Sequence, residues 1–142
     1  MPSLDDRFEQ YIDAAKKTNI HAGLSRVYES LPAEASALPH LLFHGPAGVG
    51  KYTQALMALS RYSPSNMKYD KIMRITNDKH VYQLRMSDVH FEVDMETLGC
   101  HSRSLWNAIF NNVVDSLESM QRPVGFIVCR NFHRTHKELL DV

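Results

Sequence analysis

A glycine-rich stretch between a short apolar run and a helical pattern, LLFHGPAGVGKYTQALMAL (41–59), constrains the fold most. Gly45 to Lys51 satisfies the pattern G-x-x-x-x-G-K. Glycines allow successive N–H groups to point toward one anion, and the start of a helix adds a positive dipole. The stretch therefore predicts a buried strand over 41–43, a phosphate-binding loop and a helix over 50–62. The plainer alternative is a glycine turn with the lysine in solvent.

The predicted nucleotide-binding residues form one run: Gly45, Pro46, Ala47, Gly48, Val49, Gly50, Lys51, Tyr52 and Thr53. Lys51 supplies a mobile positive charge for the outer phosphates. Tyr52 stands where the motif has a Ser or Thr whose hydroxyl reaches magnesium, and a phenolic hydroxyl lies much farther from the backbone. Thr53 comes one residue late, which on a helix is a rotation of about 100°. We therefore expect phosphate binding to survive this change better than magnesium-dependent hydrolysis does.

The acids of a hydrolytic site are also missing after the second apolar run, VGFIVCR (124–130). P-loop ATPases hold magnesium with a carboxylate at the end of a buried parallel strand. Here the run predicts such a central strand, and Arg130, Asn131 and His133 occupy the positions where acids are expected. An alternative source of the acid is the neighbouring predicted strand, with Asp88, Glu92 and Asp94.

The remaining patterns predict an α/β protein whose parallel sheet is flanked by helices. Residues 1–37 are predicted to form an N-terminal helical segment, and residues 38–142 a partial nucleotide-binding domain. The expected elements are helices over 4–17 (N-cap Ser3), 22–31 and 102–120 (N-cap Ser102), a hairpin over 71–86, a strand over 90–95 and a final helix within 133–142. That final pattern ends without a capping residue, so we expect the chain to be a piece of a longer protein.

Composition excludes some classes of partner. The formal net charge is zero, so no general basic field attracts nucleic acid. No apolar run approaches the ~18 residues of a membrane span, and two cysteines, Cys100 and Cys129, favour a reducing intracellular compartment. Zinc binding through Cys100, His101, His133 and His136 is a weaker interpretation than packed or exposed histidines, because structural zinc needs four ligands in paired spacings.

The combined pattern resembles the small subunits of replication factor C-type clamp loaders, which are AAA+ ATPases. One subunit of this family has a loop that reads G-K-K-T, in which a bulky residue separates the lysine from the threonine. GPAGVGKYTQALMAL has the same order, with Tyr52 between Lys51 and Thr53. YQLRMSDVHFEVDM is similar to the family's extended segment with a Ser-Asp pair, here Ser87-Asp88. VGFIVCRNFHRTHKELL matches a strand, an acidic box and a helix. The resemblance covers most of 38–142, but the family usually has acids between Arg130 and His133.

The resemblance implies an AAA+ module in a ring that opens a sliding clamp and places it on primed DNA during replication. It implies ATP or ADP as ligand and other clamp-loader subunits, the sliding clamp and primer–template DNA as partners. It places the chain in the nucleus or at a viral replication site. The segments NFHRTH and LGCHS are not hallmarks of the family and favour a divergent, viral branch. Weak or absent hydrolysis is expected, with no assured role for Mg²⁺. The rivals are a small P-loop NTPase or kinase whose acid lies on the 88–94 strand, and an assembly scaffold that binds no nucleotide.

Overall fold

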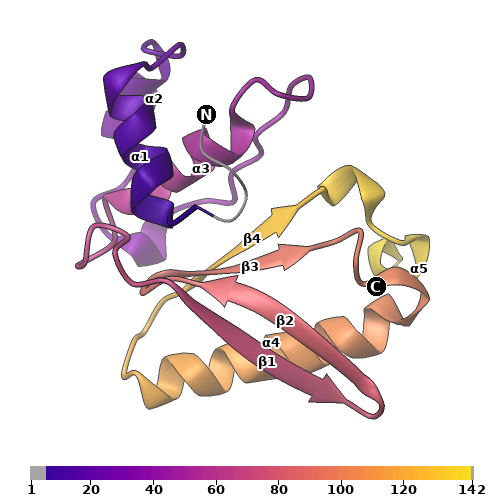
Figure 1. Ribbon diagram of the computed structural model, residues 1–142. Coiled ribbons are helices and arrows are strands. Elements are labelled where there is room, and N and C mark those ends of the chain that lie inside the picture. The colour runs from indigo at the N-terminus through magenta and orange to yellow at the C-terminus, as the bar shows by residue number, and fades with distance from the viewer. Residues whose placement is uncertain (1–5, 142) are drawn as a thin grey trace. The chain divides into compact units, whose positions relative to one another are not determined.

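A computed structural model describes residues 6–141 of the chain, which forms two compact units that divide between Asp70 and Lys71 (Figure 1). The first unit contains the helices α1 (Phe8–Lys17), α2 (Leu24–Glu29) and α3 (Lys51–Ser60), and the short 3-10 helix η1 (Ala35–Ala37). The helices predicted over 4–17, 22–31 and 50–62 are thus present. The predicted N-cap, Ser3, lies outside the described residues, and Arg7 occupies the N-cap of α1.

The core of the first unit follows from helical periodicity. α1 buries Phe8, Tyr11, Ile12 and Ala15, which fall on one face at helical spacing. α3 packs against α1 and contributes Leu56, Ala58 and Leu59 to the same core. The helix that follows the glycine loop is therefore held in place by the N-terminal helix of the chain.

The strand predicted over 41–43 is wrong. Residues 38–46 run without regular secondary structure, and Leu42 is 80% exposed. A strand is defined by hydrogen bonds to a neighbouring strand, and the described part of the first unit contains no strand that could provide them. An apolar run in the sequence does not by itself show whether a neighbouring strand is available for pairing.

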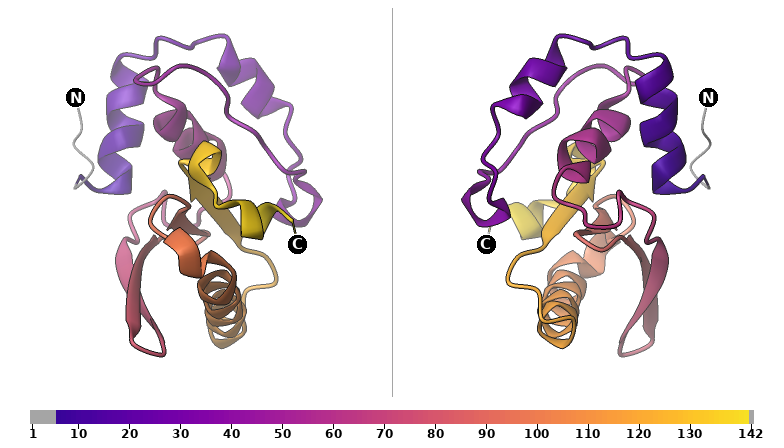
Figure 2. Two further views of the ribbon diagram at one scale, coloured as in Figure 1. Left: turned by 90° about the vertical axis from the view of Figure 1, so that its right-hand side faces the viewer. Right: turned by 90° about the vertical axis from the view of Figure 1, so that its left-hand side faces the viewer.

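The second unit is a four-stranded sheet with the helix α4 (Ser102–Ser119) along one face (Figure 2). The strands lie in the order β1 (Lys71–Asn77), β2 (His80–Met86), β3 (His90–Asp94) and β4 (Phe126–Arg130). Three short helices complete the unit: η2 (Gly99–His101), η3 (Phe132–Arg134) and α5 (Lys137–Leu140). The α/β class and the flanking helix agree with the prediction.

The prediction of a parallel sheet is wrong for most of this sheet. β1 pairs antiparallel with β2, β2 pairs antiparallel with β3, and only β3 and β4 are parallel. The turns before β2 and β3 are too short for a crossover, so they join antiparallel strands, whereas α4 provides the long crossover that a parallel pair requires. β4, predicted to be central, lies at one edge of the described sheet, and all five of its residues are only half-buried.

α4 is the main packing element of the second unit. It buries Ser102, Leu105, Ile109 and Val113. Ser102 does not cap the helix as predicted, because His101 is the N-cap and Ser102 is the first helical residue. Phe110 is 49% exposed because it follows the buried stripe by one residue and points away from it.

Ile109 and Phe110 give a matched test of this arrangement. Ile109 is fully buried, so Ile109→Ala should lower the free energy of unfolding by about 2–5 kcal/mol. Phe110→Ala removes a larger side chain but should cost clearly less, because half of that side chain is already in water. Urea unfolding of the two variants measures both values. Equal losses would contradict the assigned face of α4.

Candidate functional site

The glycine loop of the first unit has the backbone geometry that its sequence predicts. Gly48 and Gly50 adopt φ values of 76° and 87°, in the left-handed region that favours glycine. Gly50 is the N-cap of α3, so the helix begins at Lys51, directly after the loop. Among residues 6–141, no backbone hydrogen bond uses the N–H of Ala47, Gly48, Val49 or Gly50. These donors, next to a helix N-terminus, remain available to an anion.

The Lys51 side chain folds back over the loop. Its ammonium nitrogen Nζ donates to the carbonyl oxygens of Gly45, at 2.7 Å, and Pro46, at 2.5 Å. These contacts keep the positive charge of Lys51 next to the backbone of the loop. An ammonium makes such bonds through a flexible stem, so it can exchange carbonyl oxygens for phosphate oxygens without moving the backbone.

A second group of side chains, from the turn after α1 and from α2, contacts the loop and α3. His21 Nε2 donates to the carbonyl oxygen of Val49 at 2.6 Å, which places the proton of that nitrogen toward the loop. Gln54, which is buried on α3, accepts from the Tyr28 hydroxyl at 2.8 Å and donates to Asn19 Oδ1 at 3.4 Å. Burial raises the pKa of Tyr28, so its hydroxyl stays protonated as the donor of this bond.

Sequence reasoning missed these four supporting residues. Asn19, His21 and Tyr28 lie far from the loop in sequence, and none belongs to a recognisable motif. Asn19 and His21 lie between α1 and α2, Tyr28 lies on α2, and only tertiary packing brings them to Val49 of the loop and Gln54 of α3. Gln54 carried a weak signal, since it is a polar residue on the helix face that also presents buried apolar residues.

Tyr52 packs against α1. Its ring meets the Tyr11 ring edge to face, with centroids 5.0 Å apart and an interplanar angle of 89°. Such pairs contribute about 0.5–1.5 kcal/mol beyond the burial of their area. The residue at the motif's magnesium position thus contributes to the packing between two helices, which a Ser or Thr side chain could not do.

The acidic-box positions lie in the second unit, at the end of β4. Arg130 NH1 lies 4.0 Å from Glu92 Oε2, and His133 is exposed. Asn131 adopts φ 52° and donates from Nδ2 to Asp94 Oδ1 at 3.1 Å. Arg130 and Asn131, two of the three positions where an acid is missing, thus interact with acids of β3.

The three alternative acids differ in what surrounds them. Glu92 is buried and accepts from His90 Nε2 at 3.2 Å, in addition to facing Arg130. Asp88 is also buried, just before β3. Asp94 is half-exposed and ends β3, opposite Arg130 in the parallel register with β4. Because ligands of α/β sheets bind beyond the carboxyl ends of parallel strands, Asp94 is the acid best placed for chemistry in this unit.

Within residues 6–141, no cluster of three or more His, Cys, Asp or Glu residues could hold a metal ion. Cys100 is exposed and Cys129 is half-buried on β4, and neither forms a disulfide. Burial raises the pKa of the Cys129 thiol, which keeps it in the neutral form that neither binds metal nor attacks as a nucleophile.

Comparison with known proteins gives no assignment: no protein-family model and no curated protein matches this chain. In the described part of the chain, none of the helices has the length and apolar character needed to cross a membrane. The site must therefore be judged on its own geometry.

Tyr52 offers a direct test of the packing role. Tyr52→Thr restores the usual hydroxyl residue of the motif but removes the aromatic pair, so the free energy of unfolding should fall by about 1 kcal/mol or more. We expect no gain in phosphate release, because Arg130 and Asn131 still occupy positions where the motif's acids are expected. Tyr52→Phe is the matched control, because it keeps the aromatic pair with Tyr11. Phosphate release appearing in Tyr52→Thr would contradict this view of the site.

His21 tests the support of the loop. His21→Ala removes the donor to Val49 and should cost about 0.5–1.5 kcal/mol of stability. Amide hydrogen exchange over 45–50 should become faster. His44→Ala, at an exposed histidine with no hydrogen bond assigned to it, is the control and should leave exchange unchanged. Unchanged exchange in His21→Ala would show that this hydrogen bond does not hold the loop.

Proposed function

We propose that the chain binds ATP or ADP through residues 45–53 and hydrolyses it weakly or not at all. We further propose that it acts as a clamp-loader-like AAA+ subunit in DNA replication. The nucleotide would then be a structural ligand that helps a ring of subunits to assemble around a sliding clamp and primer–template DNA. In such rings a subunit that does not hydrolyse its own nucleotide still supports its neighbours.

The observation that carries nucleotide binding is the arrangement of donors around the loop. Four consecutive residues, 47–50, have backbone N–H groups without backbone partners, and Lys51 holds its ammonium over the same loop. Backbone donors at a helix N-terminus together with one lysine are the features by which P-loops hold phosphate. An ordinary glycine turn needs neither the lysine contact nor the supporting bond from His21.

Two separate features support weak hydrolysis. Tyr52 packs on Tyr11, so α3 offers no short hydroxyl at the motif's magnesium position. Arg130 and Asn131 replace the acids that would hold the metal and interact with Glu92 and Asp94. Magnesium needs oxygen ligands in near-ideal geometry, and both customary protein ligands are altered.

The clamp-loader role rests on the resemblance of the loop, the Ser87-Asp88 segment and the 124–140 segment to that family. The ring neighbours, the clamp and primed DNA are proposed on the same ground. A second candidate is a P-loop NTPase or kinase that uses Asp94, and the position of Asp94 at the carboxyl end of β3 favours it over Asp88 and Glu92.

Nucleotide binding is tested with Lys51→Ala. The variant should bind ATP at least about tenfold more weakly, since a charge-assisted hydrogen bond is worth about 1.5–3 kcal/mol. Isothermal titration calorimetry measures the affinity. Lys17→Ala, which removes the same charge from the exposed end of α1, is the control and should bind normally. If the unmodified chain does not bind nucleotide at millimolar concentration, both nucleotide-binding candidates are excluded and only the assembly scaffold remains.

Phosphate release separates the two nucleotide-binding candidates. The clamp-loader-like subunit should release almost no phosphate from ATP by itself. Release that is lost in Asp94→Asn and kept in Asn131→Ala would instead establish the P-loop NTPase. Addition of clamp-loader subunits and a sliding clamp, followed by gel filtration with and without ATP, tests the assembly role separately.

A further inference from the structure

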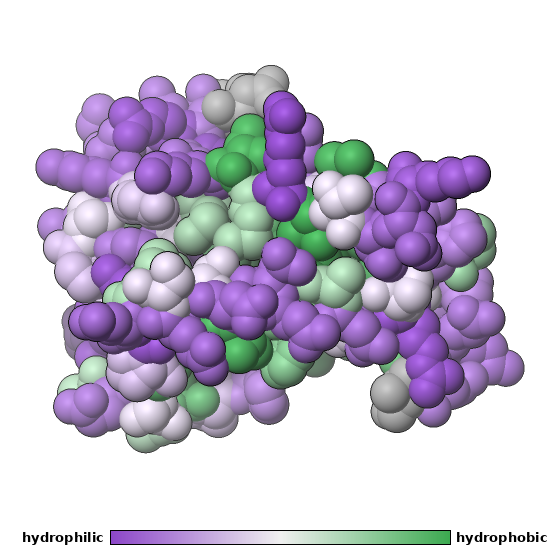
Figure 3. Space-filling model, turned by 90° about the horizontal axis from the view of Figure 1, so that it is seen from below, coloured by the Kyte–Doolittle hydropathy of each residue, from purple (hydrophilic) through white to green (hydrophobic). Residues whose placement is uncertain are grey.

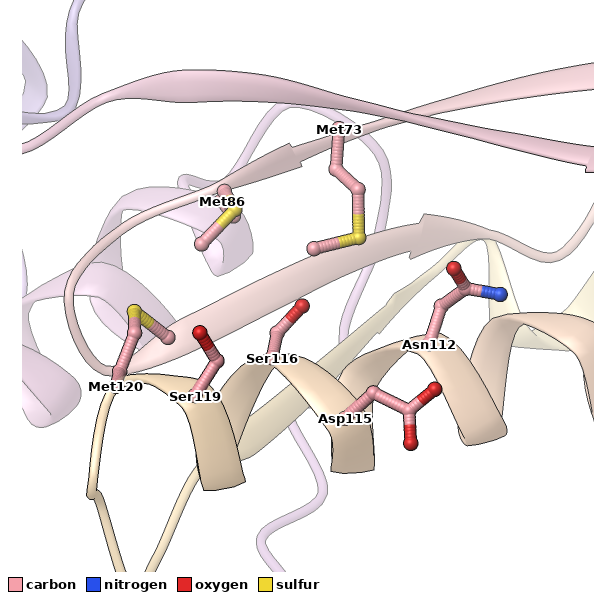
Figure 4. A pocket seen from close by; sticks show the side chains of 7 residues that line it. All are labelled: Met73, Met86, Asn112, Asp115, Ser116, Ser119 and Met120. Atoms are coloured by element: carbon pink, nitrogen blue, oxygen red, sulfur yellow. The ribbon is translucent and has the colours of Figure 1, made fainter.

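The second unit has a groove that the sequence does not indicate. The buried stripe of α4, which ends at Val113, continues at the same spacing to Ser116 and Met120. Serine is too small to fill the space that a leucine would fill at this point. A groove of about 300 Å³ therefore opens between the C-terminal third of α4 and the β1–β2 hairpin (Figure 4). Its lining residues are Met73, Met86, Asn112, Asp115, Ser116, Ser119 and Met120.

Three methionines supply the apolar part of the groove. Met73 comes from β1, Met86 from β2 and Met120 from the end of α4, and Figure 4 shows their thioether groups on the groove side of these elements. Unbranched thioethers adjust to the shape of a guest and make favourable sulfur–aromatic contacts. The groove is thus suited to an inserted aromatic side chain.

The polar part of the groove carries negative charge. Asp115 is the only charged residue of the lining, and it is exposed. Lys71 of β1 and Arg122, which follows α4, are basic, but neither lines the groove. The groove lies along the last turns of α4, where the helix dipole also favours a cation. These charges are complementary to a lysine or arginine.

The form of the groove favours a polypeptide over a small molecule. The groove is an open trough, so a small ligand would remain largely in water, whereas ligand pockets cover most of their ligand. Figure 3 shows apolar residues among hydrophilic ones at the molecular surface. The groove itself combines three methionines with polar side chains, and such a lining fits one anchoring side chain better than a broad apolar interface.

We propose that this groove is a docking site for a partner polypeptide segment that carries one aromatic residue flanked by lysine or arginine. The aromatic ring lies among Met73, Met86 and Met120, and the flanking cation lies beside Asp115. The hydroxyl groups of Ser116 and Ser119 accept or donate hydrogen bonds at the edge of the segment. The proposal concerns residues 71–142 alone and does not depend on nucleotide binding.

Methyl-labelled methionine gives a residue-resolved test. The full chain, labelled at the methyl carbons of its seven methionines, is titrated with the peptide acetyl-Lys-Trp-Lys-amide and followed by NMR. Met73, Met86 and Met120 should shift together with one dissociation constant, while Met57 and Met67 of the first unit should not. Acetyl-Lys-Ala-Lys-amide, which lacks the anchor, should cause no saturable shift. Acetyl-Glu-Trp-Glu-amide should bind more weakly than the lysine peptide.

Variants of α4 separate the two contributions. Ser116→Leu fills the groove and should abolish the methionine shifts. Asp115→Asn should weaken binding of the lysine peptide about two- to fivefold and leave the glutamate peptide unweakened, as expected for an exposed ion pair. Glu118→Gln removes one charge from the same helix outside the lining and is the matched control, which should bind normally. Asp115→Asn keeps the test valid if Ser116→Leu does not fold.

Several results would overturn the proposal. Equal binding of the lysine and glutamate peptides would exclude the charge complementarity. Equal binding of the alanine peptide would exclude the aromatic anchor. Tryptamine binding as tightly as the peptide would assign the groove to small aromatic amines. Shifts of the three methionines that depend on protein concentration without peptide would assign it to a second copy of the chain.

Discussion

The contact of the Lys51 ammonium with the carbonyl oxygens of Gly45 and Pro46 is the interaction on which the candidate site depends. It holds the loop closed upon itself and places a positive charge next to the unpartnered N–H groups of residues 47–50. The same lysine is the first residue of α3, so the loop and the helix dipole are joined at one point. α1 in turn fixes α3 through the aromatic pair of Tyr11 and Tyr52.

Nucleotide binding and hydrolysis make different demands on this architecture. Binding needs the backbone donors and one cation, and the first unit has both. Hydrolysis needs a metal and precisely placed acids, and the positions that would supply them are used for other contacts. Tyr52 serves the packing of two helices, and Asn131 donates to Asp94. The proposed nucleotide binding therefore does not require the altered metal-ligand positions.

The periodic elements were predictable from the sequence because their signal is local. α4, the hairpin of β1 and β2, β3 and the helix after the glycine loop all follow from the spacing of apolar residues and from turn residues. The sheet was not predictable to the same degree, since pairing depends on partners distant in sequence. Leu41 to Phe43 has the composition of a strand and forms none, and β4 has the composition of a central strand and lies at an edge.

The candidate site was likewise predictable from the sequence only in part. The run from Gly45 to Lys51 is contiguous, so its sequence predicts both the loop and the helix that follows. His21 reaches the loop and Tyr28 reaches Gln54 of α3 only through tertiary packing, and neither carries a signal in the sequence. The methionine groove depends on a missing side chain volume at Ser116, which becomes visible only when α4 is seen against the hairpin.

The magnesium dependence of ATP binding tests the central claim most directly. A loop that holds phosphate through backbone donors and Lys51, without a protein ligand for the metal, should bind ATP in excess EDTA within about threefold of its affinity in excess magnesium, a difference below about 1 kcal/mol. Calorimetric titration of the full chain under both conditions gives the two dissociation constants. Binding that requires magnesium and is lost in EDTA would contradict the account, because it would show that the metal site is intact.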